Sequence, residues 1–169
     1  MATTTDPTPL TRLKAGDAFP AITVTPADGA PLRLPDDIAG RFAVVLFYRG
    51  AWCPYCNAQL RAFQRAHDTL RKLDVSVIAL SVDDPDTTRV VIAEHGLEFP
   101  IGHSADAHVI AEVTGAFLNA DPVYLQSTGF VLGPDGKVIV SVYSSGAIGR
   151  LVPEDVAGLV EYVRAHTPT

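Results

Sequence analysis

The chain has 169 residues, of which 47% are hydrophobic and 19% charged, and its formal net charge at pH 7 is −6. This composition is typical of a well-packed globular protein rather than a disordered one. The negative charge disfavours nucleic-acid backbones and anionic membrane surfaces as partners. Asp, Arg, Gly or Pro interrupts every apolar run before it could cross a bilayer, and the start of the chain does not resemble a secretory signal. We therefore expect a cytoplasmic protein that binds neither nucleic acid nor membranes.

Residues 1–13 are expected to form a flexible tail, because the chain starts with a stretch rich in Thr, Pro and Asp. Residues 14–169 contain no repeat or low-complexity tract and are predicted to form a single domain. Within it, residues 19–34 alternate apolar and polar side chains around a Pro-Ala-Asp-Gly turn, which predicts a β-hairpin. The continuous apolar runs 41–48 and 75–82 are typical of strands buried on both faces of a parallel sheet.

Between these two runs, apolar residues recur at spacings of three and four, which predicts one helix. Pro54 suits its first position, because its missing N–H costs nothing there. The stripe consists of Cys53, Cys56, Leu60, Phe63, His67 and Leu70.

The second half of the chain carries further start and stop signals. Asp84 and Pro85 predict the beginning of a helix that ends near Gly96. The short stretch 98–101 is predicted to be an edge segment. Ser104 is predicted to cap a helix with Val109, Ile110 and Val113 on its apolar side.

The end of the chain is predicted to contain a hairpin and a helix. Residues 129–143 are two strand-like runs around Gly-Pro-Asp-Gly, and Pro153 opens a helix with an apolar stripe of Val156, Leu159, Val160 and Val163. Early βαβ units and a late antiparallel hairpin together predict an α/β fold, with a mixed sheet and helices on both faces.

The two cysteines, in Trp-Cys-Pro-Tyr-Cys, lie where the first buried strand turns into its helix. A cysteine reacts as a thiolate, so a reactive site needs positive potential. The helix N-terminus supplies such potential at Cys53, and Arg49 is a candidate to add a full charge. Cys56 lies one helical turn further on and can resolve an oxidised Cys53. Because the stripe runs through Cys56 into the core, Cys53 is expected to be the more exposed cysteine.

Other interpretations of these residues remain open. The pair could be buried packing residues, or half of a zinc site, although there is no second CxxC and no histidine pair at zinc-finger spacing. His67 is rejected as a base, since it would lie roughly 16 Å from Cys56 along the helix axis. Trp52 and Tyr55 are candidates for a substrate lip, with simple packing as the alternative. Arg150 is interpreted as an ordinary loop arginine, with a contact to an anionic substrate as the less favoured alternative.

The motif Trp-Cys-Pro-Tyr-Cys resembles the redox motif of thioredoxins and glutaredoxins. Residues 77–117 and 129–140 resemble the peroxiredoxins of the alkyl hydroperoxide reductase / thiol-specific antioxidant family, so the resemblance extends over about residues 14–143. It implies a thioredoxin-like three-layer sandwich with an N-terminal β-hairpin.

The resemblance implies changed helper residues. Peroxiredoxins carry Pro-x-x-x-Thr/Ser-x-x-Cys; if their reactive cysteine falls on Cys56, the Thr/Ser place is Cys53 and the Pro place is Arg49. Their activating arginine falls on Ser127, near the place of the thioredoxin proline that faces substrates. Ser127 and Thr128 are therefore candidate substrate-binding residues, and Arg49 is a candidate replacement for the missing guanidinium. Helix position favours attack by Cys53, and the peroxiredoxin pattern favours Cys56.

The function implied is a thiol-dependent antioxidant oxidoreductase that reduces hydroperoxides through Cys53, Cys56 and Arg49. One alternative is a thiol–disulfide oxidoreductase acting on protein or low-molecular-weight disulfides, and a second is a redox-sensing or binding module without turnover. No metal, flavin or haem cofactor is expected. The expected partners are a hydroperoxide or disulfide substrate and an external thiol reductant of the thioredoxin, glutaredoxin or low-molecular-weight class, with a homodimer as a possible assembly.

Overall fold

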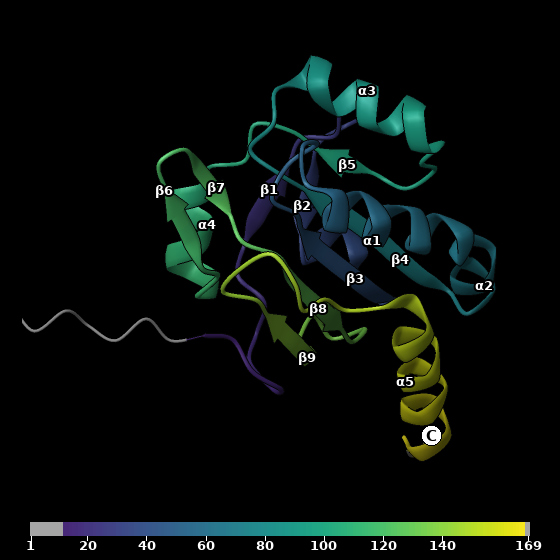
Figure 1. Ribbon diagram of the computed structural model, residues 1–169. Coiled ribbons are helices and arrows are strands. Elements are labelled where there is room, and N and C mark those ends of the chain that lie inside the picture. Colours follow the sequence, from purple (N-terminus) through teal and green to yellow (C-terminus); the bar gives the residue numbers. More distant parts are fainter. Residues whose placement is uncertain (1–11, 168–169) are drawn as a thin grey trace, which may run out of the picture.

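The computed structural model describes residues 12–167 (Figure 1). Its centre is a five-stranded sheet in the order β5-β4-β3-β8-β9. The strands β3, β4 and β5 are parallel, and β8 pairs antiparallel with both β3 and β9. The mixed sheet is therefore confirmed. The strands are β3 Phe42–Phe47, β4 Val75–Leu80, β5 Ile101–Gly102, β8 Thr128–Leu132 and β9 Val138–Tyr143.

The central strand β3 is buried over its whole length, which agrees with its continuous apolar sequence. Alternate side chains of β3 enter two separate cores. Val44 and Leu46 pack on one face of the sheet, and Val45 and Phe47 on the other. This alternation gives the three layers that the sequence predicts.

The first face is covered by four helices (Figure 1). These helices are α1 Pro54–Arg65, α2 His67–Lys72, α3 Pro85–His95 and α5 Pro153–His166. The second face is covered by α4 Ala107–Thr114, by the predicted N-terminal hairpin of β1 Ile22–Val24 and β2 Leu32–Leu34, and by the 3-10 turn η1 Asp36–Ile38.

The predicted single helix after the cysteines is interrupted. At Ala66 the backbone takes φ −90° and ψ 1°, which ends α1 and starts the short α2. No Gly or Pro marks this position. The turn lets Leu70 stay fully buried under α2 while His67 reaches Glu98, with His67 Nδ1 3.0 Å from Glu98 Oε2. Tertiary packing here overrides a locally continuous helical pattern.

The prediction for α4 was wrong in two respects. Asp106, not Ser104, caps the helix, and its carboxylate accepts the Val109 N–H at 3.2 Å. Val109 is exposed and Val113 is more than a third exposed, so of the predicted stripe only Ile110 is buried. The buried face is built around Ile110 with Ala107, Ala111 and Thr114, small residues that let the helix lie close to the sheet.

A small hairpin that the sequence pattern does not predict lies between α4 and β8. It consists of β6 Leu118–Ala120 and β7 Val123–Leu125, which pair antiparallel. The predicted tail lies almost entirely outside the described residues. Its last residue, Leu13, is held in place, because its N–H donates to Tyr143 Oη at 2.9 Å and its carbonyl accepts from Ser141 Oγ at 2.7 Å.

The other boundaries agree with the predictions. The helix α3 is capped by Asp84 and ends at Gly96, which adopts the left-handed conformation that favours glycine. The strand β5 is a two-residue edge strand, and α5 begins at Pro153. None of the helices within residues 12–167 combines the length and the apolar character that a membrane crossing requires.

The second core is centred on Phe130, which is fully buried and makes edge-to-face contacts with Phe19, Phe47 and Tyr143 at centroid distances of 5.2, 5.6 and 5.7 Å. We expect Phe130→Ala to lower the free energy of unfolding by about 3–5 kcal/mol, because it removes a large buried ring and leaves a cavity. Urea denaturation measures this change. The control is Val90→Ala on the exposed face of α3, for which a change within about 0.5 kcal/mol is expected. Equal effects of the two substitutions would contradict this view of the core.

Candidate active site

Both cysteines lie at the carboxyl end of β3, where the chain turns into α1. Cys53 is the N-cap residue of α1, and its Sγ accepts the Cys56 N–H at 3.3 Å. Pro54 occupies the first helical position, as predicted. The sulfur of Cys53 therefore takes the place of a capping oxygen and receives the positive end of the helix.

The expectation that Cys53 is the more exposed cysteine was wrong. Both cysteines are free thiols with 0% exposure. Two guanidinium groups lie against the sulfurs and cover them, so burial is not decided by the helical stripe alone. These groups belong to Arg49 and Arg150.

Arg49 contacts both sulfurs with different parts of the residue. Its backbone N–H donates to Cys56 Sγ at 3.3 Å, and its Nη1 lies 3.9 Å from Cys53 Sγ. The guanidinium is held from the other side, because Nη2 donates to Tyr124 Oη at 3.1 Å and its carbon lies 4.8 Å from the centre of the Trp52 ring. These distances place Arg49 beside both thiols, as the sequence predicted.

Arg150 is the residue that sequence reasoning undervalued. Its Nη2 lies 3.0 Å from Cys56 Sγ and 3.6 Å from Cys53 Sγ, and Nη1 donates to the Ala147 carbonyl at 2.5 Å. The interpretation as an ordinary loop arginine was therefore wrong. The direction of β9 in the sheet is the signal that identifies Arg150 as a site residue. Since β9 runs parallel to β3, the loop that follows β9 emerges at the edge of the sheet that holds the cysteines.

The two thiols differ in acidity. Burial alone would raise the pKa of Cys53, but the hydrogen bonds from the Cys56 thiol and backbone N–H, together with Arg49 and Arg150, lower it overall. Burial raises the pKa of Cys56, and the hydrogen bond to Cys53 raises it further. The pKa of Cys53 is thus the lower of the two.

The turn before the cysteines is fixed from two sides at Ala51. Its N–H donates to Asp83 Oδ2 at 2.8 Å, and its carbonyl accepts from Asn57 Nδ2 at 2.9 Å. A Cβ at Gly50 would lie 2.3 Å from Trp52 Nε1, so a side chain there would displace the Trp52 ring. Burial raises the pKa of Asp83, although the hydrogen bond from the Ala51 N–H acts in the opposite direction and lowers it. Asp83 follows β4, which is parallel to β3, so it reaches the same edge.

The predicted substrate-binding residues fall into two groups. Trp52 and Tyr55 are more than half exposed at the rim of the site, and the Trp52 ring meets Tyr124 edge to face at 5.0 Å. Ser127 and Thr128 are buried at the start of β8, and the Thr128 hydroxyl donates to the Gln126 carbonyl at 3.0 Å. Neither side chain forms a hydrogen bond to a sulfur or a guanidinium within the described residues, so their role stays a prediction.

Three further features bear on the chemistry. Burial raises the pKa of Tyr48, behind Cys56, to about 12, so its hydroxyl stays protonated and does not serve as a base. Within residues 12–167 the Cys, His, Asp and Glu side chains form no group of three that could hold a metal ion. A groove of about 320 Å³ runs along α1 beside Arg150, with Tyr55, Ile148 and Val152 in its lining.

A cysteine pair at the start of a helix, over the carboxyl end of a central strand, with two arginines on the sulfurs, defines a thiol-based redox protein. Solved structures share the fold. AhpC of Mycobacterium tuberculosis matches with a TM-score of 0.77 at 20% identity, and covers 94% of this chain and 97% of its own. AhpC of Enterococcus faecalis matches with a TM-score of 0.78 at 17% identity, over 94% of this chain and 98% of its own. The predicted thioredoxin-like architecture is therefore confirmed.

The sequence comparisons identify the family. The AhpC/TSA family matches residues 15–141. A peroxiredoxin of Methanothermobacter thermautotrophicus is 31% identical over 156 residues, which are 89% of this chain and 71% of the relative. A putative peroxiredoxin of Mycobacterium tuberculosis is 32% identical over 151 residues, 85% and 94% of the two chains. The chain belongs to the AhpC/TSA family, the peroxiredoxins, and its activity is that of a thiol-dependent peroxidase.

Removal of the Arg150 charge should make Cys53 less reactive at neutral pH. We expect Arg150→Gln to raise the pKa of Cys53 and to slow its alkylation by iodoacetamide at pH 7 about tenfold, since a cation within about 4–6 Å favours the thiolate. The rate should recover at a pH well above the thiol pKa, where the charge no longer decides ionisation. A pH profile of alkylation in a Cys56→Ser background measures this. Arg89→Gln on α3, whose guanidinium lies 2.9 Å from Asp86 Oδ1, is the control. An unchanged profile for Arg150→Gln would remove Arg150 from the site.

Proposed function

We propose that Cys53 is the cysteine that attacks the hydroperoxide and that Cys56 resolves it. The proposal rests on the difference between the two thiols. Cys53 caps α1 and has a lowered pKa, whereas Cys56 has a raised pKa. A thiolate is the nucleophile, so the thiol that ionises first at neutral pH is the better attacking group.

The proposed cycle has three balanced steps. The Cys53 thiolate attacks the terminal oxygen of ROOH; an S–O bond forms, the O–O bond breaks, and the leaving alkoxide takes a proton to become ROH. The Cys56 thiol then attacks the sulfenic sulfur, forming the disulfide and releasing water. Two external thiols reduce the disulfide by exchange and are themselves oxidised to a disulfide. The i, i+3 spacing on α1 puts both sulfurs in reach of each other.

We assign Arg49 and Arg150 the role of stabilising the negative charge that moves from the sulfur to the leaving oxygen during attack. Both guanidinium groups lie against Cys53 Sγ, so they face the oxygen atoms of a hydroperoxide placed on that sulfur. Fixed donors in a buried site stabilise developing charge without solvent reorganisation. Arg49 then takes the role of the family arginine whose place falls on Ser127.

The complete burial of both sulfurs favours a small hydroperoxide over a protein disulfide as the substrate. A hydroperoxide oxygen reaches a recessed sulfur, whereas a disulfide within a folded partner needs an exposed one. Trp52 and Tyr55 at the rim are proposed to contact the organic part of the substrate. The reductant is an external thiol of the thioredoxin, glutaredoxin or low-molecular-weight class. We also propose that the protein is located in the cytoplasm, where thiols stay reduced, and that it forms a homodimer.

The order of the cysteines is tested by stopped-flow fluorescence of the reduced protein mixed with cumene hydroperoxide. Trp52 is the only tryptophan and its ring stacks on Arg49, so its emission should follow oxidation. We expect Cys56→Ser to keep a first oxidation step of ~10⁴ M⁻¹s⁻¹ or faster and to stop at the sulfenic acid, whereas Cys53→Ser reacts at the rate of a free thiol. Mass spectrometry of the trapped sulfenic acid is the second readout. Fast oxidation of Cys53→Ser alone would assign the attack to Cys56, as the family pattern does.

Arg49→Ala should slow the same oxidation step about 100-fold, because it removes one of the two donors to the developing charge. The backbone donor to Cys56 remains in this variant, so the fold and the pKa of Cys56 should change little. Arg65→Ala, at the exposed end of α1, is the matched control. Full reactivity of Arg49→Ala would end its assignment as the replacement guanidinium.

A further inference from the structure

The amino-terminal half of β4 is an open edge of the central sheet. The edge strand β5 pairs only with Ala79 and Leu80, so the backbone edge of Val75 to Ile78 has no strand partner on that side, while the side chains of Val75, Val77 and Ile78 are buried in the cores. These residues lie at the opposite end of β4 from Asp83 and the thiol site. The opening is therefore separate from the peroxidase machinery.

The hydrogen-bonding pattern shows which groups are open. On the β5 side, the Ala79 N–H donates to the Pro100 carbonyl at 3.0 Å and the Ser81 N–H to the Gly102 carbonyl at 3.2 Å. Backbone groups alternate in direction along a strand, so the N–H and C=O of Val75 and Val77 point to the same side. The described part of the chain supplies no backbone partner for them there.

Pro100 explains why the pairing stops. The next bond of the parallel ladder would run from the N–H of residue 100 to the carbonyl of Val77, and proline has no N–H to donate. The chain then bends away at Phe99 and Glu98 and leaves a cleft of about 300 Å³ instead of a longer strand.

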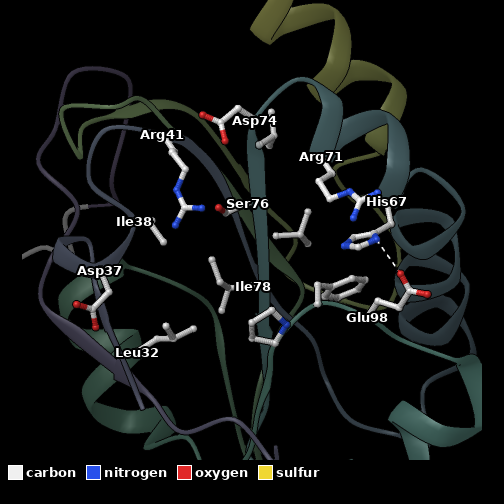
Figure 2. A pocket seen from close by; sticks show the side chains of 14 residues that line it. Leu32, Asp37, Ile38, Arg41, His67, Arg71, Asp74, Ser76, Ile78 and Glu98 are labelled. Atoms are coloured by element: carbon white, nitrogen blue, oxygen red, sulfur yellow. Dashed lines mark ion pairs between the residues drawn. The ribbon is translucent and has the colours of Figure 1, made fainter. Parts of the chain in front are cut away.

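Figure 2 shows this cleft with β4 along its floor. One wall comes from the N-terminal hairpin, η1 and the start of β3, and the other from α2 and the segment before β5. The first wall carries Leu32, Asp37, Ile38 and Arg41, and the second His67, Arg71, Glu98 and Phe99. Each wall thus combines apolar and charged side chains. An extended chain laid along β4 would direct alternate side chains to the two walls.

Most charged side chains in the cleft already have an ion-pair partner. Asp37 pairs with Arg33, Glu98 with His67, and Arg71 with Asp68. Arg41 and Asp74, which both line the cleft, form no ion pair within residues 12–167, and in Figure 2 the guanidinium of Arg41 points toward Ser76 on the cleft floor. An acidic side chain is the complement of this guanidinium.

We propose that this cleft binds an extended peptide segment of a partner protein, which adds a strand to β4 through Val75 and Val77 and places an acidic side chain on Arg41. Main-chain hydrogen bonds give such strand addition its affinity, and pockets for alternate side chains give it specificity. The floor lies between two walls, so a single extended chain reaches it, whereas the edge of a second folded copy would meet the walls first.

The test uses the full-length protein and a capped hexapeptide of alternating valine and threonine with one terminal glutamate. Titration is followed in ¹H–¹⁵N correlation spectra. We expect shift changes confined to residues 75–78, to Glu98 and Phe99, and to Arg41, with the emission of Trp52 unchanged. Two sets of N-methylated peptides separate strand pairing from side-chain contact. Each peptide has a single backbone N–H blocked by a methyl group; the first set blocks odd-numbered residues and the second set even-numbered ones. One set should lose binding and the other should keep it, because only alternate N–H groups face β4.

The charge is tested by reversal on both sides. Arg41→Glu should weaken binding of the glutamate peptide about tenfold and strengthen binding of the corresponding lysine peptide, whereas Arg61→Glu on the exposed face of α1 should do neither. Equal binding of both N-methylated sets, no binding at millimolar peptide, or shift changes centred on the Tyr55 groove would overturn the proposal. Concentration-dependent dimerisation with the same shift changes in the absence of peptide would also overturn it, since the occupant would then be a second copy.

Discussion

The site depends on the contact between two buried sulfurs and two guanidinium groups. A thiolate with no exposed surface is costly unless cations and N–H donors compensate for the lost water. Here Arg49, Arg150 and the first turn of α1 supply that compensation. The same donors that make Cys53 acidic also close the site, so acidity and burial arise from one set of contacts.

The sheet topology brings these donors together from distant parts of the sequence. Arg49 follows β3, Asp83 follows β4 and Arg150 follows β9, and all three strands run in the same direction. Their carboxyl ends therefore meet at one edge, as is common for the sites of open α/β sheets. The antiparallel β8 is what allows β9 to point the same way as β3 (Figure 1).

The sequence was sufficient where local rules act alone. The apolar run of β3, the Asp84 cap of α3 and the proline at the start of α1 each follow from the chemistry of a few neighbouring residues. It was insufficient where distant contacts decide. The break at Ala66 has no local marker, the exposure of Cys53 depends on arginines from two loops, and Arg150 becomes recognisable only when the direction of β9 is known. Tyr124, which holds Arg49, lies on the hairpin that the periodicity did not indicate.

The double contact of Arg49 has a consequence for how this position can vary. When its reactive cysteine is aligned with Cys56, the peroxiredoxin pattern that the sequence resembles has proline here, and proline carries neither a guanidinium nor a backbone N–H. In this chain one residue supplies both groups: the side chain serves Cys53 and the main chain serves Cys56. Most exchanges at this position would remove only the first donor, and only a return to proline would remove both. Tolerance at residue 49 should therefore be stepped: lysine keeps a cationic donor, most other amino acids keep only the main-chain donor and share an intermediate level, and proline alone lies below them.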